Sequence, residues 1–226
     1  MLTLPTTDGR LEPYELSSEP LVPRAPRVPL TRAAFAAAHV VSDPLSERNP
    51  WDTRPAVDWE ATLRFREGLW DQGLGLAEAM DTAQRGMGVD WPTARELVER
   101  TMRAAKDHPM RPRVASGAGT DHVPLADLRD ADAIVAAYET QMEALEAAGS
   151  QLILMATRAL PAIGADADAY AAVYGRLIEQ AREPVILHWL GDMFDPGLAG
   201  YWGSHDVTRA TETALALIEA HPSKVD

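Results

Sequence analysis

The hydrophobic positions of the chain follow a pattern that repeats five times from Phe35 onward. In each repeat, a short run that is apolar at nearly every position precedes a longer segment whose apolar residues recur at helical spacing. Continuous apolar runs are typical of strands buried on both faces, and the helical spacing is typical of amphipathic helices. The predicted strands are 35–41, 74–80, 113–117, 151–156 and 184–189, and the predicted helices are 58–72, 91–106, 132–148, 168–180 and 206–220.

Strands separated by single helices run parallel, because each crossover returns the chain to the same edge of the sheet. The pattern therefore predicts an α/β protein. No G-x-G-x-x-G motif follows the first strand, which disfavours a dinucleotide-binding sheet. Polar residues follow every predicted strand, as a parallel (β/α)8 TIM barrel requires, so we favour this barrel over a flavodoxin-like open sheet.

The pattern contains about five βα units, whereas a TIM barrel has eight. A sixth strand is expected to begin at 224–226, where this sequence stops. Five strands cannot close the barrel, and an open sheet of apolar strands leaves two edges unpaired. We therefore expect 31–226 to form an incomplete barrel that by itself is unstable or self-associates, and we expect a homo-oligomer for a full-length protein.

Residues 1–30 differ from the rest, because they are rich in proline and carry scattered polar residues. Proline lacks a backbone N–H group and does not fit the interior of a helix or a central strand. The sequence therefore predicts an N-terminal arm, with a small β-hairpin, ahead of the barrel.

Charge and composition narrow the classes of function. The net charge is −13, with 34 acidic and 21 basic residues, and such a surface repels nucleic acids and anionic membranes. The absence of cysteine excludes disulfides, thiolate metal sites and a cysteine nucleophile. The sequence has neither the layout of a signal peptide nor an apolar run long enough to span a bilayer. We expect a cytoplasmic protein whose partner is a small-molecule substrate.

Candidate functional residues can be sorted by topology, since the catalytic face of a parallel barrel is formed by the C-terminal ends of its strands and the loops that follow them. Thr82 and Asp195 fall on this face. The candidates for substrate binding there are His39, Asp81, Gln84, Arg85, Gly117, Gly119, Thr120, Asp121, Thr157, Arg158, Trp189 and Asp192.

Glu78 and His188 are the catalytic candidates, because each lies inside an apolar run at a strand end. A buried carboxylate needs a partner, and Arg85, Arg158, a histidine or a metal ion would serve Glu78. A histidine at this position is suited to acid–base work. The alternative for His188, and equally for His39, is a core histidine that is hydrogen-bonded to a neighbour.

Two further features suggest anion binding, each with a simpler alternative. The segment 117–120 (GAGT) would let backbone N–H groups approach a carboxylate or phosphate, or it is a tight turn. Arg158 would clamp a substrate carboxylate in bidentate fashion, or it forms a surface ion pair.

Lysine usage restricts the chemistry further. A Schiff-base enzyme needs a desolvated lysine amine that points into the barrel. The sequence contains only Lys106 and Lys224, and both fall at the face opposite the predicted site. These residues therefore do not supply an imine-forming lysine.

With the strand ends assigned, the chain resembles an uncharacterised bacterial family related to dihydrodipicolinate synthase, among the class I aldolase-like barrels. The resemblance covers almost everything after the arm, and its second and fifth segments are the most specific. The segments that carry it are FAAAHVVSDP (35–44), GLGLAEAMDTAQRGMG (73–88), SGAGTD (116–121), QLILMATRAL (151–160) and PVILHWLGDMFDPGLAGYWG (184–203).

The resemblance implies a Schiff-base carbon–carbon lyase or aldolase whose lysine lies in a G-V-K segment of the sixth strand, beyond Asp226. The run PVILHW resembles P-V-I-L-Y-N of the superfamily, which places His188 and Trp189 at the pocket. Two departures argue against pyruvate as the substrate. The sequence has 78–81 (EAMD) in place of a Thr-Thr pair, and 157–159 (TRA) in place of a tyrosine.

The leading hypothesis is therefore a dihydrodipicolinate synthase-like lyase or aldolase that acts on a small oxo acid and needs no cofactor. One alternative is a metal-dependent hydrolase or isomerase with a divalent cation at His39, Glu78, Asp81 and His188, although no H-x-H or H-E-x-x-H spacing is present. Another is a catalytically inactive, ligand-binding descendant of such an enzyme.

Overall fold

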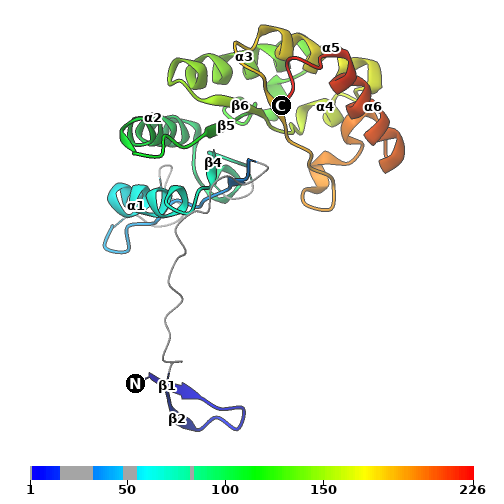
Figure 1. The fold of residues 1–226 in the computed structure, drawn as a ribbon. Coiled ribbons are helices and arrows are strands. Elements are labelled where there is room, and N and C mark those ends of the chain that lie inside the picture. Colours follow the sequence, from blue (N-terminus) through cyan, green and yellow to red (C-terminus); the bar gives the residue numbers. More distant parts are fainter. Residues whose placement is uncertain (1, 16–32, 48–54, 82–83) are drawn as a thin grey trace.

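The computed structural model describes residues 2–15, 33–47, 55–81 and 84–226. Its centre is a five-stranded sheet with the order β3-β4-β5-β6-β7, and every neighbouring pair is parallel. The strands are β3 (Phe35–Ala36), β4 (Gly75–Glu78), β5 (Val114–Ala118), β6 (Gln151–Leu154) and β7 (Ile186–Leu187). The sheet follows chain order and has the helices along one side (Figure 1), which confirms the predicted α/β fold as an incomplete TIM barrel.

Five long helices connect or follow the strands, and an aspartate caps the N-terminus of each. Each Asp side chain accepts a hydrogen bond from the backbone N–H three residues later, which satisfies a group that the helix itself leaves unpaired. The helices, each given with its capping residue, are α1 (Trp59–Trp70; Asp58), α2 (Trp91–Asp107; Asp90), α3 (Ala131–Ala147; Asp130), α5 (Ala167–Gln180; Asp166) and α6 (Val207–Ala220; Asp206).

Side chains alternate between the two faces of the sheet. Ala77, Ala115 and Ile153 belong to one apolar cluster on the concave side of the barrel. Their neighbours Leu76 and Leu152 belong to the clusters that include helix residues. Because successive strand residues point to opposite faces, Glu78 lies on the helix side, like Leu76.

The two edge strands are shorter than predicted. The first predicted strand covers 35–41, but only Phe35 and Ala36 pair with β4. Beyond them the chain leaves the sheet, and Ser42 forms an antiparallel bridge with Val57. At the other edge, Val225 forms a parallel bridge with Val185, at the place predicted for the start of a sixth strand. An edge strand has a partner on one side only, so fewer of its residues are held in the ladder.

The predicted hairpin in the N-terminal arm is present. Strand β1 (Leu2–Pro5) pairs with β2 (Leu11–Tyr14) in antiparallel fashion, and Gly9 in the turn has a φ of 79°. The remainder of the predicted arm lies largely at 16–32, outside the described residues, so its boundary near residue 30 stays a prediction. Among the described helices, none has the length and apolar character needed to cross a membrane.

Candidate functional site

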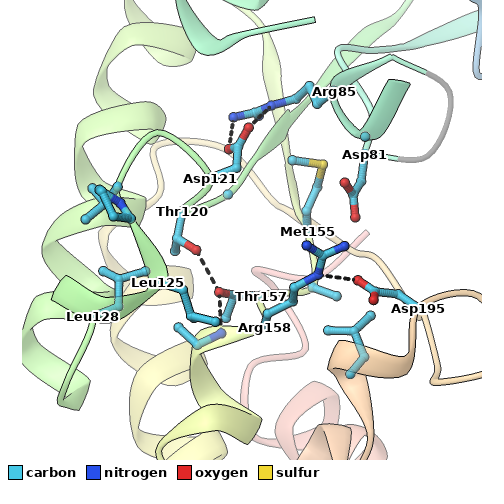
Figure 2. Close-up of a pocket in the computed structure, with 17 residues that line it drawn as sticks. Asp81, Arg85, Thr120, Asp121, Leu125, Leu128, Met155, Thr157, Arg158 and Asp195 are labelled. Carbon is cyan, nitrogen blue, oxygen red and sulfur yellow. Dashed lines mark hydrogen bonds and ion pairs between the residues drawn. The ribbon is translucent and has the colours of Figure 1, made fainter. Parts of the chain in front are cut away.

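A cavity of about 470 Å³ opens at the C-terminal ends of β4, β5 and β6 (Figure 2). Short helices in the loops shape its walls: η1 (Arg85–Met87), η2 (Leu125–Asp127), α4 (Ala159–Ala162) and η3 (Pro196–Leu198). This is the catalytic face predicted from topology. The predicted site residues that line the cavity are Asp81, Arg85, Gly119, Thr120, Asp121, Thr157 and Arg158.

Arg85 is buried beside the cavity, and its donors are occupied by protein groups. Its Nε donates to Asp121 Oδ2 at 2.9 Å, and its Nη2 also contacts Asp121. Nη1 donates to the Gly117 carbonyl at 2.9 Å, and Nη2 donates to Gln141 Oε1 at 2.8 Å. The guanidinium lies 5.1 Å from the centre of the Trp91 ring. Arg85 therefore positions Asp121 at the cavity and is not itself available to a ligand.

Arg158 is the more accessible guanidinium. Its side chain is 65% exposed, and its Nε donates to Asp195 Oδ2 at 2.6 Å. This hydrogen bond raises the pKa of Arg158. Among the described residues, Arg158 donates hydrogen bonds through Nε, so its two Nη groups remain for a ligand. Figure 2 shows the Arg158 guanidinium between the carboxylates of Asp81 and Asp195.

Asp81 follows β4 and is the carboxylate of the cavity with a raised pKa. Burial is the main cause, and the charge of Asp121 adds to it, while Arg158 and Arg85 act in the opposite direction. A carboxyl group with a raised pKa holds its proton at a higher pH than an ordinary aspartate. Asp81 is therefore suited to accept and return a proton during a reaction.

The back of the cavity is held by hydroxyl and backbone contacts. Thr120 and Thr157 hydrogen-bond to each other through their Oγ1 atoms at 2.7 Å. Thr157 Oγ1 also accepts from the Ala159 N–H at 3.1 Å. Their hydrogen bond connects the loop after β5 to the loop after β6. Part of the hydrogen-bonding capacity of both hydroxyls is therefore used before any ligand binds.

The glycines of the segment 117–120 lie at the end of β5 and just after it, and their contacts are with the protein itself. The Gly119 N–H, a candidate anion donor, donates instead to Gln141 Oε1 at 2.7 Å. A Cβ atom at Gly117 would lie 2.6 Å from Met155 Sδ and 2.8 Å from the Ala79 carbonyl oxygen. This close approach of two strand ends explains the glycine at 117.

A buried tyrosine cluster fixes Met155, which lines the cavity. The Met155 carbonyl accepts hydrogen bonds from Tyr138 and, at 3.2 Å, from Tyr174. The Tyr174 and Tyr201 hydroxyls lie 2.5 Å apart. Burial raises the pKa of Tyr138 well above its usual value, so these phenols stay neutral and serve as a hydrogen-bonded scaffold.

Glu78, the first catalytic candidate, does not line the cavity. Its carboxylate is fully buried and receives Arg66 Nε at 2.6 Å and Arg66 Nη2 at 2.8 Å. Thr101 Oγ1 and Gln84 Nε2 each donate to it at 2.8 Å. The expected partners were Arg85, Arg158, a histidine or a metal; the actual partner is Arg66 of α1. Because Glu78 points toward the helices, it cannot share a cavity with Arg158.

His188, the second candidate, lies at the end of β7 but outside the cavity lining. Burial lowers its pKa, while the charge of Asp81 acts in the opposite direction. Its Nδ1 atom is buried and has no hydrogen-bond partner among the described residues. Burial therefore favours the neutral imidazole. The ring lies within electrostatic range of Asp81, and its Nδ1 can form a further hydrogen bond.

The remaining candidates lie elsewhere. The side chain of His39 is exposed, and Gln84 is buried in the network of Glu78 and also donates to the Ala38 carbonyl. Trp189 stacks on Trp202, with ring centres 6.1 Å apart. Asp192 is exposed, and Thr82 lies outside the described residues.

The proposed metal set does not converge. His39 is exposed, and both oxygens of Glu78 are held by Arg66. No group of three or more His, Cys, Asp or Glu side chains suited to a metal ion occurs within the described ranges. The metal-dependent alternative therefore lacks the site that it named.

Sequence reasoning missed two important side chains, Arg66 and Gln141. Thr62, Arg66 and Trp70 recur at four-residue intervals and are all buried. Two polar residues at the spacing of a buried helix face were the signal in the sequence that pointed to Arg66. Gln141 lies in the apolar stripe of α3 and is bonded to Arg85 and Gly119. A buried polar residue inside an apolar stripe was the signal for it as well.

Comparisons with known proteins give a family for the chain and a likeness of its fold to dihydrodipicolinate synthase. A family model described as "Protein of unknown function (DUF993)" matches residues 2–226. A crystal structure of dihydrodipicolinate synthase matches with a TM-score of 0.53 and 12% identity, over 84% of this chain and 53% of that one. The chain thus spans about half the length of that structure. A putative phosphonomutase from Burkholderia cenocepacia J2315 matches with a TM-score of 0.41 and 15% identity, over 72% of this chain and 65% of that one. No curated protein matched.

Proposed function

Because the chain belongs to the DUF993 family of proteins of unknown function, we propose its activity from its barrel and its cavity. The proposed reaction is cleavage or formation of a carbon–carbon bond in a small oxo acid, as in a Schiff-base aldolase. The observation that carries this proposal is that one cavity at the strand ends is lined by both Arg158, whose Nη groups remain for a ligand, and Asp81, a carboxyl group with a raised pKa.

Arg158 holds the carboxylate of the substrate in this proposal. Its Nη groups face the cavity beside Asp81, and a guanidinium matches the planar geometry of a carboxylate. Asp195 accepts a hydrogen bond from Nε and so fixes the orientation of the guanidinium. The N–H groups of Nη1 and Nη2 then point in a defined direction. The carbonyl group of the oxo acid is then placed toward the mouth of the barrel.

Asp81 handles the proton of the reaction. In the cleavage direction, the carboxylate takes the proton of a substrate hydroxyl as the adjacent carbon–carbon bond breaks. The electron pair of that bond passes to a protonated imine at the former carbonyl carbon and gives an enamine. His188 is proposed as a second proton carrier, because it is neutral and its Nδ1 has no partner among the described residues.

The imine requires a lysine amine that attacks the carbonyl carbon with loss of water. Lys224 donates to the Ala181 carbonyl at 2.6 Å, and Lys106 lies near the end of α2. Neither lines the cavity. We therefore propose that the lysine comes from a part of the protein outside residues 1–226.

Reductive trapping tests this function. The protein, with any residues that follow Asp226 in its gene, is incubated with a panel of oxo acids and cyanoborohydride and then analysed by mass spectrometry. One lysine is expected to carry a substrate-derived adduct. Arg158→Ala should reduce the trapping rate by about tenfold or more, since it removes a charge-assisted contact. The control is Arg176→Ala, which removes an exposed arginine paired with Asp132 and Glu139.

Absence of any adduct across the panel would overturn the Schiff-base reaction. The location of both lysines away from the cavity also favours a second candidate, a ligand-binding protein without turnover. Thermal stabilisation of the protein by an oxo acid, without an adduct and without product, would support that candidate.

A further inference from the structure

The cavity has two chemically different walls. Its charged and aliphatic side chains line different parts of it: Figure 2 shows Asp81, Arg158 and Asp195 close together on one side, and Leu125 and Leu128 on another. The charged wall consists of Asp81, Arg85, Asp121, Arg158 and Asp195. The aliphatic wall consists of Val123, Pro124, Leu125 and Leu128, all from the segment that follows β5.

The charged wall has room for one carboxylate. Asp121 pairs with Arg85 and Asp195 pairs with Arg158, and the three nitrogens of Arg85 already donate to Asp121, Gly117 and Gln141. Arg158 is left as the cavity-lining guanidinium with donors to spare. A ligand with two negative charges would place the second one near carboxylates that have no surplus cation.

The aliphatic wall requires a different kind of group. Leu128 is almost fully buried, at 4% exposure, whereas Leu125 is 47% exposed. Leu128 therefore gives this wall a fixed apolar base, and most of the apolar surface that a ligand can cover belongs to Leu125. A three-carbon acid would leave most of a 470 Å³ cavity, and this wall, in contact with water. Covering exposed apolar surface is favourable in proportion to its area.

We propose that the substrate is a monocarboxylic α-keto acid with an apolar tail, aliphatic or aromatic, that packs against Leu125 and Leu128. Its carboxylate pairs with Arg158, and its carbonyl group lies near Asp81. The inference rests on the proposed function for the keto group and adds the length and charge of the tail.

A series of ligands tests the tail directly by titration calorimetry. Pyruvate, α-ketobutyrate and α-ketovalerate differ by one methylene each. Affinity is expected to rise by about fourfold per methylene, the value for burial of one such group. In the decisive comparison, α-ketoglutarate has as many carbons as α-ketovalerate but ends in a carboxylate, and it is expected to bind more weakly than pyruvate.

Variants assign the effect to this wall. Leu125→Ala should weaken binding of α-ketovalerate by about fivefold and that of pyruvate by less than about twofold, since only the longer tail reaches the leucine. Because Leu125 is half exposed, the substitution leaves no buried void. Leu215 on α6 is 50% exposed and lies away from the cavity, so Leu215→Ala is the matched control and should change neither affinity.

The outcomes separate the two proposals. Affinity that is flat or falls along the methylene series, or a preference for α-ketoglutarate, overturns the apolar tail and leaves the proposed reaction standing. An effect of Leu125→Ala that is equal for all ligands also overturns it. Absence of binding by every acid, together with absence of trapping, overturns the proposed function itself.

Discussion

Arg66 donates from two nitrogens to the carboxylate of Glu78, and both side chains are fully buried. Removing one partner of such a pair leaves an unpaired charge in a low-dielectric environment, which costs about 3–5 kcal/mol. We expect Arg66→Met to lower the free energy of unfolding by this amount, as measured by urea denaturation. Combining it with Glu78→Leu should restore part of the loss, because no unpaired charge remains.

A matched exposed pair is the control for Arg66. Arg64 and Glu60 are both exposed and lie four residues apart on the same helix. Solvent-exposed pairs of this kind contribute about 0.3–0.5 kcal/mol. Arg64→Met should therefore change the free energy of unfolding by less than about 1 kcal/mol. Equal losses of unfolding free energy in Arg66→Met and Arg64→Met would show that burial does not increase the contribution of the Arg66–Glu78 pair to stability.

Asp81 should make stability depend on pH in a recognisable direction. Its folded-state pKa is raised above the usual value of 3.8, mainly by burial. Between 3.8 and the raised value, the native state keeps a proton that the unfolded state releases, so stability falls as pH rises through this window. Asp81→Asn should remove this contribution.

The measurement for Asp81 is the carboxyl ¹³C shift followed by NMR, together with denaturant midpoints over the same pH range. Asp195 provides a contrast: burial raises its pKa, but the hydrogen bonds from Arg158 and the Gly197 N–H, together with the charge of Arg158, outweigh burial and lower the pKa. Titration of Asp81 at or below the midpoint of Asp195 would contradict the assignment of Asp81 as the proton-holding group.

At the scale of elements, the aspartate caps provide a direct test of helix formation. Asp166 caps α5 and accepts the Ala169 N–H at 2.9 Å. Replacing an N-cap by alanine costs about 0.5–2 kcal/mol, whereas asparagine can still accept the hydrogen bond. Asp166→Ala is expected to lower the free energy of unfolding by about 1 kcal/mol and Asp166→Asn by much less. Asp168, in the first turn but without a capping contact, is the control; a loss from Asp168→Ala as large as that from Asp166→Ala would refute the cap.

The helices were predictable from sequence to within one or two residues, because caps and apolar periodicity are local. The predicted helix 91–106, for example, is observed as Trp91–Asp107. The edge strands were less predictable, because their length depends on pairing with distant segments. β7 has two residues where six were expected, and only its neighbours β6 and Val225 decide how far it pairs.

The candidate site was predictable in part for a similar reason. Topology alone placed Asp81, Arg85 and Arg158 at one end of the sheet, and they line one cavity. It did not show which face of a strand each side chain occupies. A shift of one residue moves a side chain from one face to the other, so Glu78 lies among the helices while Ala77 lies on the concave face.

At the scale of the whole molecule, the sheet of the described chain is open and leaves apolar side chains near its edges. The sheet ends at β3 on one side and at β7 on the other. Phe35 and Ile186, which pack against the concave apolar cluster, are only partly buried. Met193 and Phe194, in the loop after β7, are also exposed. Exposed apolar surface beside unpaired strand edges favours association.

We therefore expect residues 1–226, purified by themselves, to self-associate and to bind a hydrophobic dye. Light scattering coupled to size-exclusion chromatography should show species larger than a monomer, with a share that rises with concentration. Ile186→Glu places a charge on the concave face next to the edge and should reduce the association and the dye signal. Ile218→Glu, at a partly exposed position on α6, should change neither. A monomer that melts cooperatively and binds no dye would contradict this prediction, because it would show that the open sheet is stable without a partner at its edges.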